Sequence, residues 1–476
     1  MATEPDTRIL RTRTPIDLGS AAARHLVTAQ LVVLVAIPAR LVFAPLGGAG
    51  TPAQILGVLM ACWWFLTKVG GFPPREQTQP VQWAVLAFYA SLLASYIAAT
   101  TRPIPPIEVS AADRGMISGL AFAGMALACA SAPSTLGQFD VLMRRLTWVG
   151  FTLALVGLLQ FATGQQLVDH IQIPGLSANS DLAVMELRGS LTRPAGTATH
   201  PIEFGAVLTM ILPVALHYAL HDTHRRPLKR WLPVGAIALA VPVSISRSAI
   251  VSTVIVLVLL MPTWPRQTRI RGCVAIMGLA TVLYVLVPGL IGTLIGLFTG
   301  ISGDTSTKSR TDSFGLAMEF IQRASIWGRG FRTFLPSYRI LDNQYLLSTI
   351  ETGVVGVLAF GGLLATAVVT TVRARRRSRD MRTRSLAQSL TASVTAAACS
   401  FALYDAFSFA MAASLLFVVL GMSGALGRLV RSSNVDSAHL ATDLEVGSTR
   451  QGCGRGQRPA RAARWPRPRH GLSHRP

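Results

Sequence analysis

The sequence predicts an all-α, polytopic membrane protein, a bundle of about twelve transmembrane helices with a helical extracytoplasmic lid loop. The first observation is composition: 51% of the 476 residues are hydrophobic and only 14% are charged, against about 25% charged in a typical soluble domain. The second is pattern, because the apolar residues form blocks of ~20 bounded by charge, as membrane-spanning helices do. The strands of a membrane barrel would instead alternate apolar and polar residues.

The apolar blocks can be assigned to spans one by one. In chain order we expect spans near residues 26–46, 51–69, 81–99, 115–132, 146–163, 202–220, 231–245, 247–264, 273–298, 345–371, 387–408 and 411–428. The division between the seventh and eighth of these is the weakest, since a single residue separates them. Read together they would form one long helix, which would invert the orientation of everything after them.

Basic runs decide between these two readings. With a cytoplasmic N-terminus and twelve spans, the runs HRRPLKR (224–230), PRQTRIR (265–271) and VRARRRSRDMRTR (372–384) all face inside, which satisfies the positive-inside rule. A single helix over 231–264 would move the last two runs outside. The charge distribution therefore favours two spans. It predicts a multi-pass protein of the cytoplasmic (inner or plasma) membrane with both termini in the cytoplasm.

The same charge pattern sets the expected domains and surface partners. We expect a cytoplasmic N-terminal segment over 1–25, a transmembrane domain over 26–430, and a basic cytoplasmic tail over 431–476 whose Arg, Pro and Gly content predicts disorder. The net charge of +22 lies mostly in the inside loops and the tail. It favours contact with anionic membrane lipids and indicates no nucleic-acid partner.

Two connections are long, and both face outward in this topology: residues 164–201 and 299–344. The second contains an amphipathic segment, with Phe314, Ala317, Met318 and Ile321 on one helical face, so we expect a helix over about 310–325 that lies on the membrane surface or caps a cavity. A packing helix without a catalytic role is the alternative. The two loops are rich in cations: Arg188, Arg193, Lys308, Arg310, Arg323, Arg329, Arg332 and Arg339.

Arg247 lies in SISRSAI (244–250), between two apolar stretches. A charge near membrane depth costs ~2.5–3.5 kcal/mol on insertion scales and usually lines a polar cavity or has a partner. Arg247 is expected either to face an anion at the outer mouth of a cavity, or to reach the interface or pair with a carboxylate such as Asp405. Convergent guanidinium groups bind phosphate in a bidentate manner. This set of arginines would suit a pyrophosphate whose lipid tail lies in the bilayer.

Three patches occur in a recognisable order: RPAGTATHPIEFG (193–205), SRSA (246–249) and SR…WGRGF…DNQYLLSTIETGVVG (309–356). Over about residues 190–360, this order resembles the O-antigen ligase and O-antigen polymerase superfamily of bacterial envelope glycosyltransferases. The resemblance implies an all-helical bundle with a periplasmic lid. It also implies transfer of a glycan from undecaprenyl pyrophosphate to a sugar hydroxyl, in envelope or exopolysaccharide synthesis, with no metal and no other cofactor.

The resemblance also implies roles for individual residues. Arg247 and Arg310 fall on the family's pyrophosphate-binding SR patches, and Arg193 falls on its R-x-x-G patch. Asp342 stands where many ligases have the His that takes the proton of the acceptor, and a carboxylate can do the same. Alternatively, Asp342 pairs with Arg339 or Arg332 and is structural. The departure leaves a polymerase, or another polyprenyl-linked glycosyltransferase, open beside a ligase.

The predicted acceptor contacts are His200, Asn343 and Tyr345, although His200 also suits a helix cap before Pro201. His217, His221 and His224 have the i, i+4, i+7 spacing of a metal site. The adjacent basic run disfavours a metal ion, and an interfacial cluster is the preferred reading.

The main alternative function is a transporter or flippase for a polysaccharide or a lipid-linked sugar, because twelve spans are also common in carriers. A carrier would show charges along a mid-span path and an inverted repeat. The polar residues here gather in the outward loops instead, which favours chemistry at the membrane surface.

Overall fold

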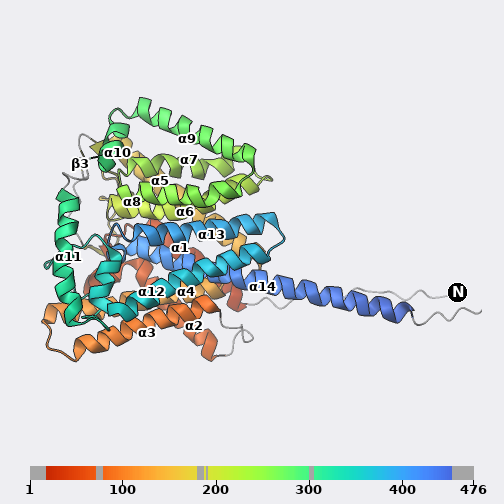
Figure 1. Ribbon diagram of the computed structural model, residues 1–476, viewed down its shortest axis with the longest axis horizontal. Coiled ribbons are helices and arrows are strands. Elements are labelled where there is room, and N and C mark those ends of the chain that lie inside the picture. Colours follow the sequence, from red (N-terminus) through yellow and green to blue (C-terminus); the bar gives the residue numbers. More distant parts are fainter. Residues whose placement is uncertain (1–17, 71–78, 180–186, 189–190, 300–304, 453–476) are drawn as a thin grey trace, which may run out of the picture. The chain divides into compact units, whose positions relative to one another are not determined.

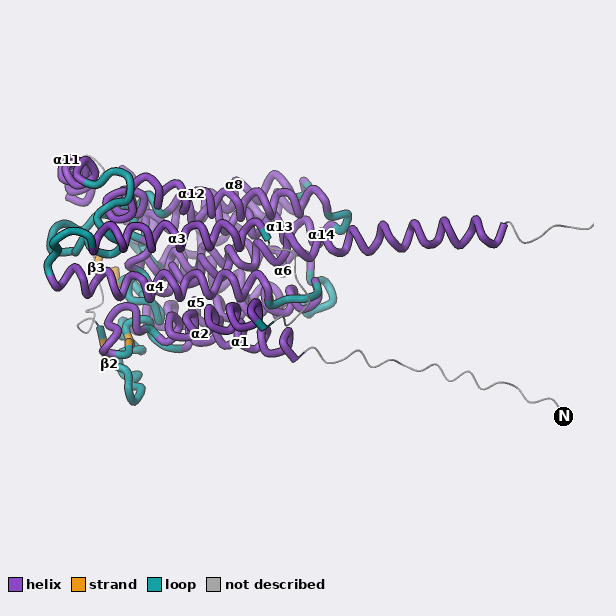
Figure 2. The backbone as a smooth tube through the Cα atoms, turned by 90° about the horizontal axis from the view of Figure 1, so that it is seen from below, coloured by secondary structure: helices purple, strands orange, loops and turns teal. Residues whose placement is uncertain are grey.

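The computed structural model describes residues 18–70, 79–179, 187–188, 191–299 and 305–452 of the 476-residue chain, without the side chains of 18–21, 305–313 and 435–452. The chain divides into two units, Met1–Val430 and Arg431–Pro476. The first unit is a bundle in which long helices run alongside one another (Figures 1 and 2). All contacts described below lie within it.

Each of the twelve predicted spans overlaps a helix of the structure. In chain order these are α1 (Leu18–Ala36), α2 (Pro52–Val69), α3 (Pro80–Thr100), α4 (Pro106–Ser131), α5 (Leu136–Thr163), α6 (Pro201–His221), α7 (Pro227–Val243), α8 (Arg247–Leu260), α9 (Arg266–Leu286), α12 (Gln344–Arg377), α13 (Met381–Ser400) and α14 (Ala410–Gly452). Two further helices, α10 (Leu290–Thr299) and α11 (Thr305–Arg323), lie between α9 and α12. The predicted all-α fold class is confirmed.

Within the described residues, eight helices are long and apolar enough to cross a membrane: α2, α3, α4, α5, α6, α9, α12 and residues 410–434 of α14. Shorter apolar helices occur at 22–36, 247–263 and 290–299. Helix α13 meets neither description, because basic residues, Ser and Thr make it too polar. It packs against α6, α8 and α12, and every residue from 386 to 394 is buried. A helix enclosed by other helices does not have to present apolar residues to lipid.

Three predicted boundaries were wrong, each for a local reason. Helix α1 ends at Ala36 rather than near residue 46, because Pro38 cannot donate a backbone hydrogen bond. The span predicted over 273–298 is two helices, broken at Pro288–Gly289, where Gly289 has φ +84°. Helix α14 continues to Gly452, past the predicted end of the last span. The predicted disorder of the tail stays a prediction for 453–476, which lie outside the described residues.

Helices α7 and α8 are separate, as the basic runs predicted. The break covers Ser244, Ile245 and Ser246, and Ile245 has φ +46°. Serine side chains satisfy local groups in the turn. The hydroxyl of Ser244 donates to the Val241 carbonyl at 2.7 Å, and the hydroxyls of Ser246 and Ser248 lie 2.9 Å apart. Arg247 is therefore the first residue of α8.

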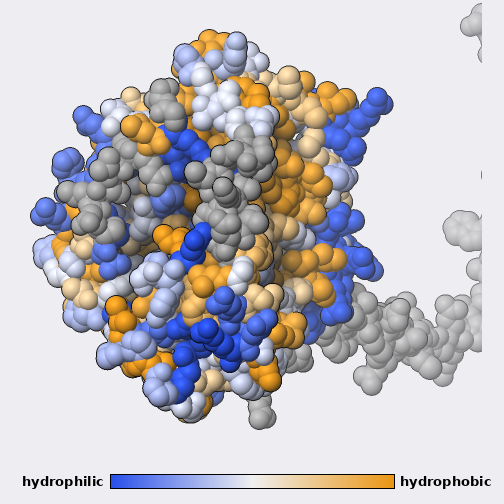
Figure 3. Space-filling model, turned by 60° about the vertical axis from the view of Figure 1, so that its left-hand side comes forward, coloured by the Kyte–Doolittle hydropathy of each residue, from blue (hydrophilic) through white to orange (hydrophobic). Residues whose placement is uncertain are grey.

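The long connections lie at one end of the first unit, which we call the long-loop end. It carries η1 (Ala44–Gly50) and two small antiparallel ladders: β1 (Leu41–Val42) with β2 (Ser177–Ala178), and β3 (Leu187–Arg188) with β4 (Leu191–Thr192). Figure 2 places β2, β3 and α11 at this end. In Figure 3, hydrophilic side chains cover much of this end, and an apolar band follows on the adjoining flank.

Helix α11 crosses the long-loop end at a steep angle to α12 (Figure 1). Its predicted apolar stripe was partly wrong. Ala317 is fully buried, and Phe320 and Ile321 pack with it against Phe334 and Leu341. Phe314 and Met318 are 56% and 53% exposed. The buried face therefore follows the 317, 320, 321 positions, and Phe314 and Met318 are left for solvent or the membrane surface.

An aromatic cluster lies beneath this end of the bundle. Phe122 and Phe417 stack with ring centroids 5.0 Å apart, and Phe360 meets Phe407 edge-on at 5.1 Å. Phe407 belongs to the connection between α13 and α14, so the cluster ties this connection to α4, α12 and α14. The loops at this end rest on this aromatic floor.

Candidate functional site

The WGRGF segment (327–331) is joined to α12 through backbone hydrogen bonds. Helix α12 is broken at Gly353, whose φ is +65°. The break frees backbone groups, and the loop pairs with them: the Arg329 amide donates to the Ile350 carbonyl at 3.0 Å, and the Gly330 amide donates to the Glu351 carbonyl at 2.8 Å. The Val354 amide donates to the Ser325 carbonyl at 2.9 Å. Irregular backbone is tolerated inside the helix bundle because it is buried in protein and its polar groups are paired.

A buried carboxylate anchors the same loop to α4. The Oε1 atom of Glu108, which is 1% exposed, accepts a hydrogen bond from Arg329 Nη2 at 2.7 Å and another from the Tyr338 hydroxyl. The Arg329 guanidinium also lies 4.8 Å from the ring centre of Phe320 in α11. Arg329 therefore holds together α4, α11 and the loop, and it is not part of a convergent phosphate-binding set.

Between these anchored segments lies a cavity of about 320 Å³. Its walls come from η1, the start of α4, the loop 331–341, the start of α12 and the connection 405–408. The lining residues are Gly48, Ala49, Ala111, Arg114, Ser118, Phe331, Arg332, Phe334, Leu335, Pro336, Arg339, Ile340, Leu341, Leu347, Glu351, Asp405, Phe407 and Ser408. It lies at the low end of the ~300–1,000 Å³ typical of small-molecule sites.

Arg332 and Asp405 bring opposite charges to this cavity. Arg332 has φ +66° and donates to the Phe407 carbonyl. Desolvation lowers the pKa of Arg332, and the nearby carboxylates of Glu351 and Asp405 act against this lowering. Burial raises the pKa of Asp405 to about 6, and the neighbouring Asp342 raises it further while Ser408 and Arg332 lower it. A carboxyl group with such a pKa exchanges protons near neutral pH, a property that is enriched at functional sites.

Glu351 supports the cavity wall from inside α12. It is only 4% exposed, and its carboxylate accepts hydrogen bonds from the backbone amides of Arg332 and Phe334. Its own carbonyl accepts from Gly330 and from the Ser95 hydroxyl, the latter at 2.7 Å. One residue thus fixes the path of the loop that carries Arg332.

The predicted donor site is partly assembled in the structure. Arg193 is buried, and its Nε donates to the carbonyl of Ser244 at 3.2 Å. Because Ser244 lies in the turn that begins α8, this contact brings Arg193 to the turn that carries Arg247. Arg310 lies in α11, but its side chain is outside the part of the structure that is described, so its convergence with Arg247 stays a prediction.

Two of the residues predicted to contact the acceptor lie at the start of α12 and have structural partners there. Asn343 caps α12, since its Oδ1 accepts from the Tyr345 and Leu346 amides at 3.0 and 3.1 Å. The Tyr345 hydroxyl donates to the Ala398 carbonyl at 2.6 Å and ties α12 to α13. Asp342 directly precedes this cap and is partly exposed. The acceptor contacts of Asn343 and Tyr345 stay predictions.

His200 caps α6, because its Nδ1 accepts from the Ile202 amide at 3.0 Å. Its ring lies 5.7 Å from that of Phe409. One turn on, fully buried Glu203 accepts from the Met411 amide at 2.7 Å and from the Thr199 hydroxyl at 2.7 Å. This part of the RPAGTATHPIEFG patch therefore fixes the start of α14. A contact between His200 and an acceptor stays a prediction.

The histidines of α6 lie in a different environment, towards the end of that helix away from His200. His217 and His221 stack at 5.0 Å and both approach the Ser385 hydroxyl, at 2.9 and 3.3 Å, while His224 is exposed. In the described part of the chain, no group of three His, Cys, Asp or Glu side chains is placed to hold a metal ion.

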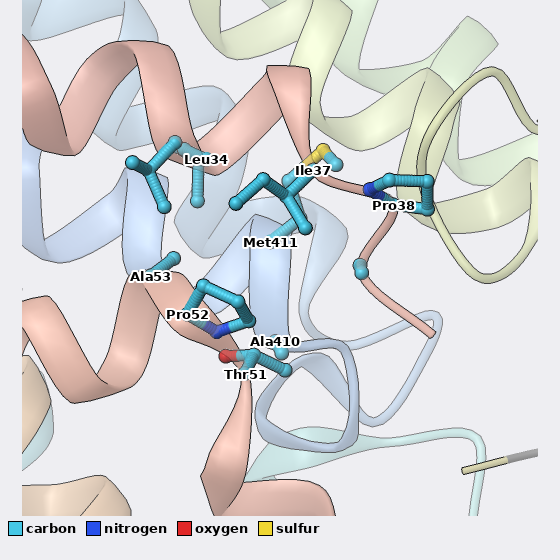
Figure 4. A pocket seen from close by; sticks show the side chains of 10 residues that line it. Leu34, Ile37, Pro38, Thr51, Pro52, Ala53, Ala410 and Met411 are labelled. Carbon is cyan, nitrogen blue, oxygen red and sulfur yellow. The ribbon is translucent and has the colours of Figure 1, made fainter. Parts of the chain in front are cut away.

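A second pocket lies between α1, α2 and α14, lined by Leu34, Ile37, Pro52 and Met411 among others (Figure 4). Its volume is about 10 Å³, which is about the space of one water molecule. Its lining is almost entirely apolar. The pocket is a packing defect near the long-loop end, and the larger charged cavity is the candidate ligand site.

Sequence reasoning missed most of the residues that line this cavity. Arg114 was not singled out because α4 reads as an ordinary span, and Glu351 because its helix is otherwise apolar. Asp405 was considered only as a partner for Arg247, whereas the structure places it beside Arg332. The sequence signal was that charges lie near the predicted outward ends of apolar helices. This signal does not say which of these charges meet in the fold.

The bundle and its cavity define a class: a multi-pass α-helical membrane protein with a charged, ligand-sized site among the loops at one end. Residues 232–361 match the family model described as O-antigen ligase. The chain therefore carries an O-antigen ligase domain, which supports the resemblance to the ligase and polymerase superfamily. The matched segment runs from α7 into α12 and includes Arg247, Arg310 and Asp342. A comparison with curated proteins finds no match.

The family indicates an enzyme with a membrane glycosyltransferase-like role in polysaccharide synthesis. In general terms it also implies a lipid-linked glycan as donor and a glycan as acceptor. The apolar helices agree with a multi-pass membrane protein.

Proposed function

We propose that this protein transfers a glycan from a polyprenyl-pyrophosphate donor to a sugar hydroxyl at the outer face of the cytoplasmic membrane, without a metal ion. The observation that carries the proposal is the contact between Arg193 and Ser244. It joins a loop arginine to the turn of Arg247 across 51 residues of sequence. Two guanidinium-bearing segments that meet at the end of a membrane helix suit a lipid-borne diphosphate.

In the proposed reaction, Arg193, Arg247 and Arg310 hold the pyrophosphate of the donor. The oxygen of the acceptor hydroxyl bonds to the anomeric carbon, and the bond from that carbon to the pyrophosphate oxygen breaks. The electron pair leaves with the pyrophosphate, whose growing negative charge the guanidinium groups stabilise. Asp342 takes the proton of the hydroxyl as general base. No nucleotide is consumed because the sugar–pyrophosphate bond is already activated.

Helix α11 is proposed to act as the lid of this site. It carries Arg310 and docks through Ala317, Phe320 and Ile321 on the loop that forms the cavity wall. Its exposed Phe314 and Met318 suit contact with the membrane surface. A lid in this position would exclude water, which would otherwise compete with the acceptor hydroxyl.

The test is transfer of lipid-linked glycan in proteoliposomes. We expect Arg247→Ala and Arg310→Ala each to lower the transfer rate about 10²–10³-fold, the effect of losing one donor that stabilises the departing charge. Arg145→Ala is the matched control, since Arg145 is exposed and contacts Thr28 of α1. Transfer at the wild-type rate by both arginine variants would refute the mechanism. Movement of lipid-linked sugar across the bilayer without a new glycosidic bond would favour a transporter or flippase instead.

A further inference from the structure

We propose that the 320 Å³ cavity is the subsite for a sugar ring of the acceptor glycan, with Arg114, Arg332 and Asp405 as its polar contacts. This inference rests on the proposed function and makes it more specific. It assigns the cavity to the acceptor and leaves the pyrophosphate to the arginines at the start of α8. The argument uses the mix of charges, the aromatic wall, the volume and the position of Asp342.

The mix of charges favours hydroxyl groups over a phosphate. Two carboxylates, of Asp405 and Glu351, line the cavity together with three guanidinium groups. A pyrophosphate would have to approach both carboxylates, and like charges in a partly buried site repel strongly. Sugar hydroxyls both donate and accept, so the same group can donate to Asp405 and accept from Arg332. Arg114 has no hydrogen bond or ion pair among the described residues, which leaves its guanidinium able to bind.

The shape of the cavity agrees with a sugar ring. Phe331, Phe334 and Phe407 line it beside the charged groups, and aromatic rings with a few placed polar groups are typical of small-molecule sites. The volume lies at the low end of the range for small-molecule sites, which suits a small ligand such as a single sugar ring. The aromatic floor and the Glu108 anchor hold these walls in place.

Position links the cavity to the chemistry. Asp342 acts electrostatically on Asp405, so the proposed base lies near one of the two carboxylates of the cavity. Leu341, directly before Asp342, is a lining residue. On the other side of the cavity, Phe409 directly follows the lining residue Ser408. Its ring contacts that of His200, which caps α6 at the end of the loop that carries Arg193. An acceptor ring in the cavity would thus have a hydroxyl beside the base.

The experiment measures binding of short, labelled oligosaccharides released from the producing cell's own envelope polysaccharide, to full-length protein in nanodiscs without donor. We expect Arg114→Gln and Asp405→Asn each to raise the oligosaccharide Kd about tenfold, the effect of one lost hydrogen bond to a charged group. In the transfer assay the same variants should raise the acceptor KM and leave the donor KM unchanged. Arg145→Ala should leave both constants unchanged, and each variant's melting temperature shows whether it is folded.

Two results would overturn the assignment. The first is oligosaccharide binding at wild-type strength in both folded variants. The second is that inorganic pyrophosphate displaces the oligosaccharide from the wild-type protein but not from Arg114→Gln. That result would make the cavity a phosphate site. Failure of the proposed function looks different: a protein that binds oligosaccharide through these residues but transfers no glycan would keep the subsite and refute the glycosyltransferase.

Discussion

At the scale of single residues, the arginines at the long-loop end divide into three roles. Arg329 is committed to Glu108 and to the rings around it, and its charge is compensated inside the protein. Arg193 binds the carbonyl of a turn. Arg332 lines the cavity, close to the carboxylates of Glu351 and Asp405. Residue type alone does not separate these roles, since a guanidinium group is equally suited to a carboxylate, a carbonyl or a ligand.

Asp405 gives a prediction in which stability and function move in opposite directions. Its pKa is raised from 3.8 to about 6, chiefly by burial. At pH 7 the carboxyl group of the folded protein is therefore ionised in surroundings that stabilise its charge less than water does. We expect Asp405→Asn to be more stable than wild type at pH 7, by about 1–3 kcal/mol. The advantage should shrink as the pH falls through 6 towards 4, because the wild-type carboxyl then becomes neutral in the folded state.

Thermal unfolding in detergent at several pH values measures this effect. The charged groups around Asp405 are Asp342, Arg332, Glu351, Arg114 and Arg339, and the substitution leaves all of them in place. A loss of stability at pH 7 would show that ionised Asp405 holds the fold together, contrary to the expectation. If Asp405 binds the acceptor, we expect Asp405→Asn to be more stable than wild type and to bind the acceptor more weakly.

At the scale of elements, the WGRGF loop and the broken turn of α12 form one structure. Neither is satisfied alone: α12 leaves backbone groups unpaired at Gly353, and the loop supplies the partners through Ser325, Arg329 and Gly330. Close approach of the two backbones requires glycine. A Cβ on Gly353 would overlap the carbonyl of Ile326, and the positive φ disfavours other residues.

We therefore expect Gly353→Ala to destabilise the protein by about 2–4 kcal/mol, from the overlap and the strained backbone together. Gly361→Ala is the matched control in the same helix, because a Cβ at Gly361 meets no atom within 4 Å. That variant should be as stable as wild type or slightly more so, since Ala favours a helix over Gly. Melting temperatures of the purified variants test this expectation. Equal melting temperatures for Gly353→Ala and Gly361→Ala would contradict the close packing of the loop against α12.

At the scale of the whole bundle, burial divides the helices into interior and peripheral ones. Helix α6 is almost entirely enclosed, with 94% of its apolar window buried, whereas only 6% of that of α9 is buried. Helix α9 therefore presents nearly all of its apolar surface outward, which is stable only in contact with lipid or a partner. The apolar flank in Figure 3 fits a bundle whose long-loop end rises out of the hydrocarbon layer.

Orientation gives the prediction at this scale. Because the basic runs lie opposite the long-loop end, we expect that end to face out of the cytoplasm. In a cysteine-free background, Ser337→Cys in the exposed cavity loop should react with a membrane-impermeant maleimide in intact cells. Thr223→Cys, exposed between α6 and α7, should react only after the membrane is opened. The reverse labelling pattern would place the cavity in the cytoplasm and exclude transfer at the outer face.

The sequence by itself determined the all-α fold class, the approximate positions of most helices, the break between α7 and α8, and the resemblance to the O-antigen ligase family. These depend on local properties: whether a stretch is apolar enough to cross lipid, and whether Pro or a basic run ends it. Its mistakes about the helices were local too. The end of α1 and the break at Gly289 follow from Pro38 and Pro288–Gly289, because these residues interrupt a helix even where the surrounding residues are apolar.

Only the tertiary structure decided what the charged residues do. Glu108 and Arg329 pair across 221 residues, and Arg332 reaches Phe407 across 75. In a bundle of many helices, packing among segments that are distant in the sequence decides which helix ends meet. The pattern of residues along the chain does not reveal these contacts. The cavity exists because α4, the kink of α12 and the connection before α14 meet at one end. Its charges act together because that packing removes them from water.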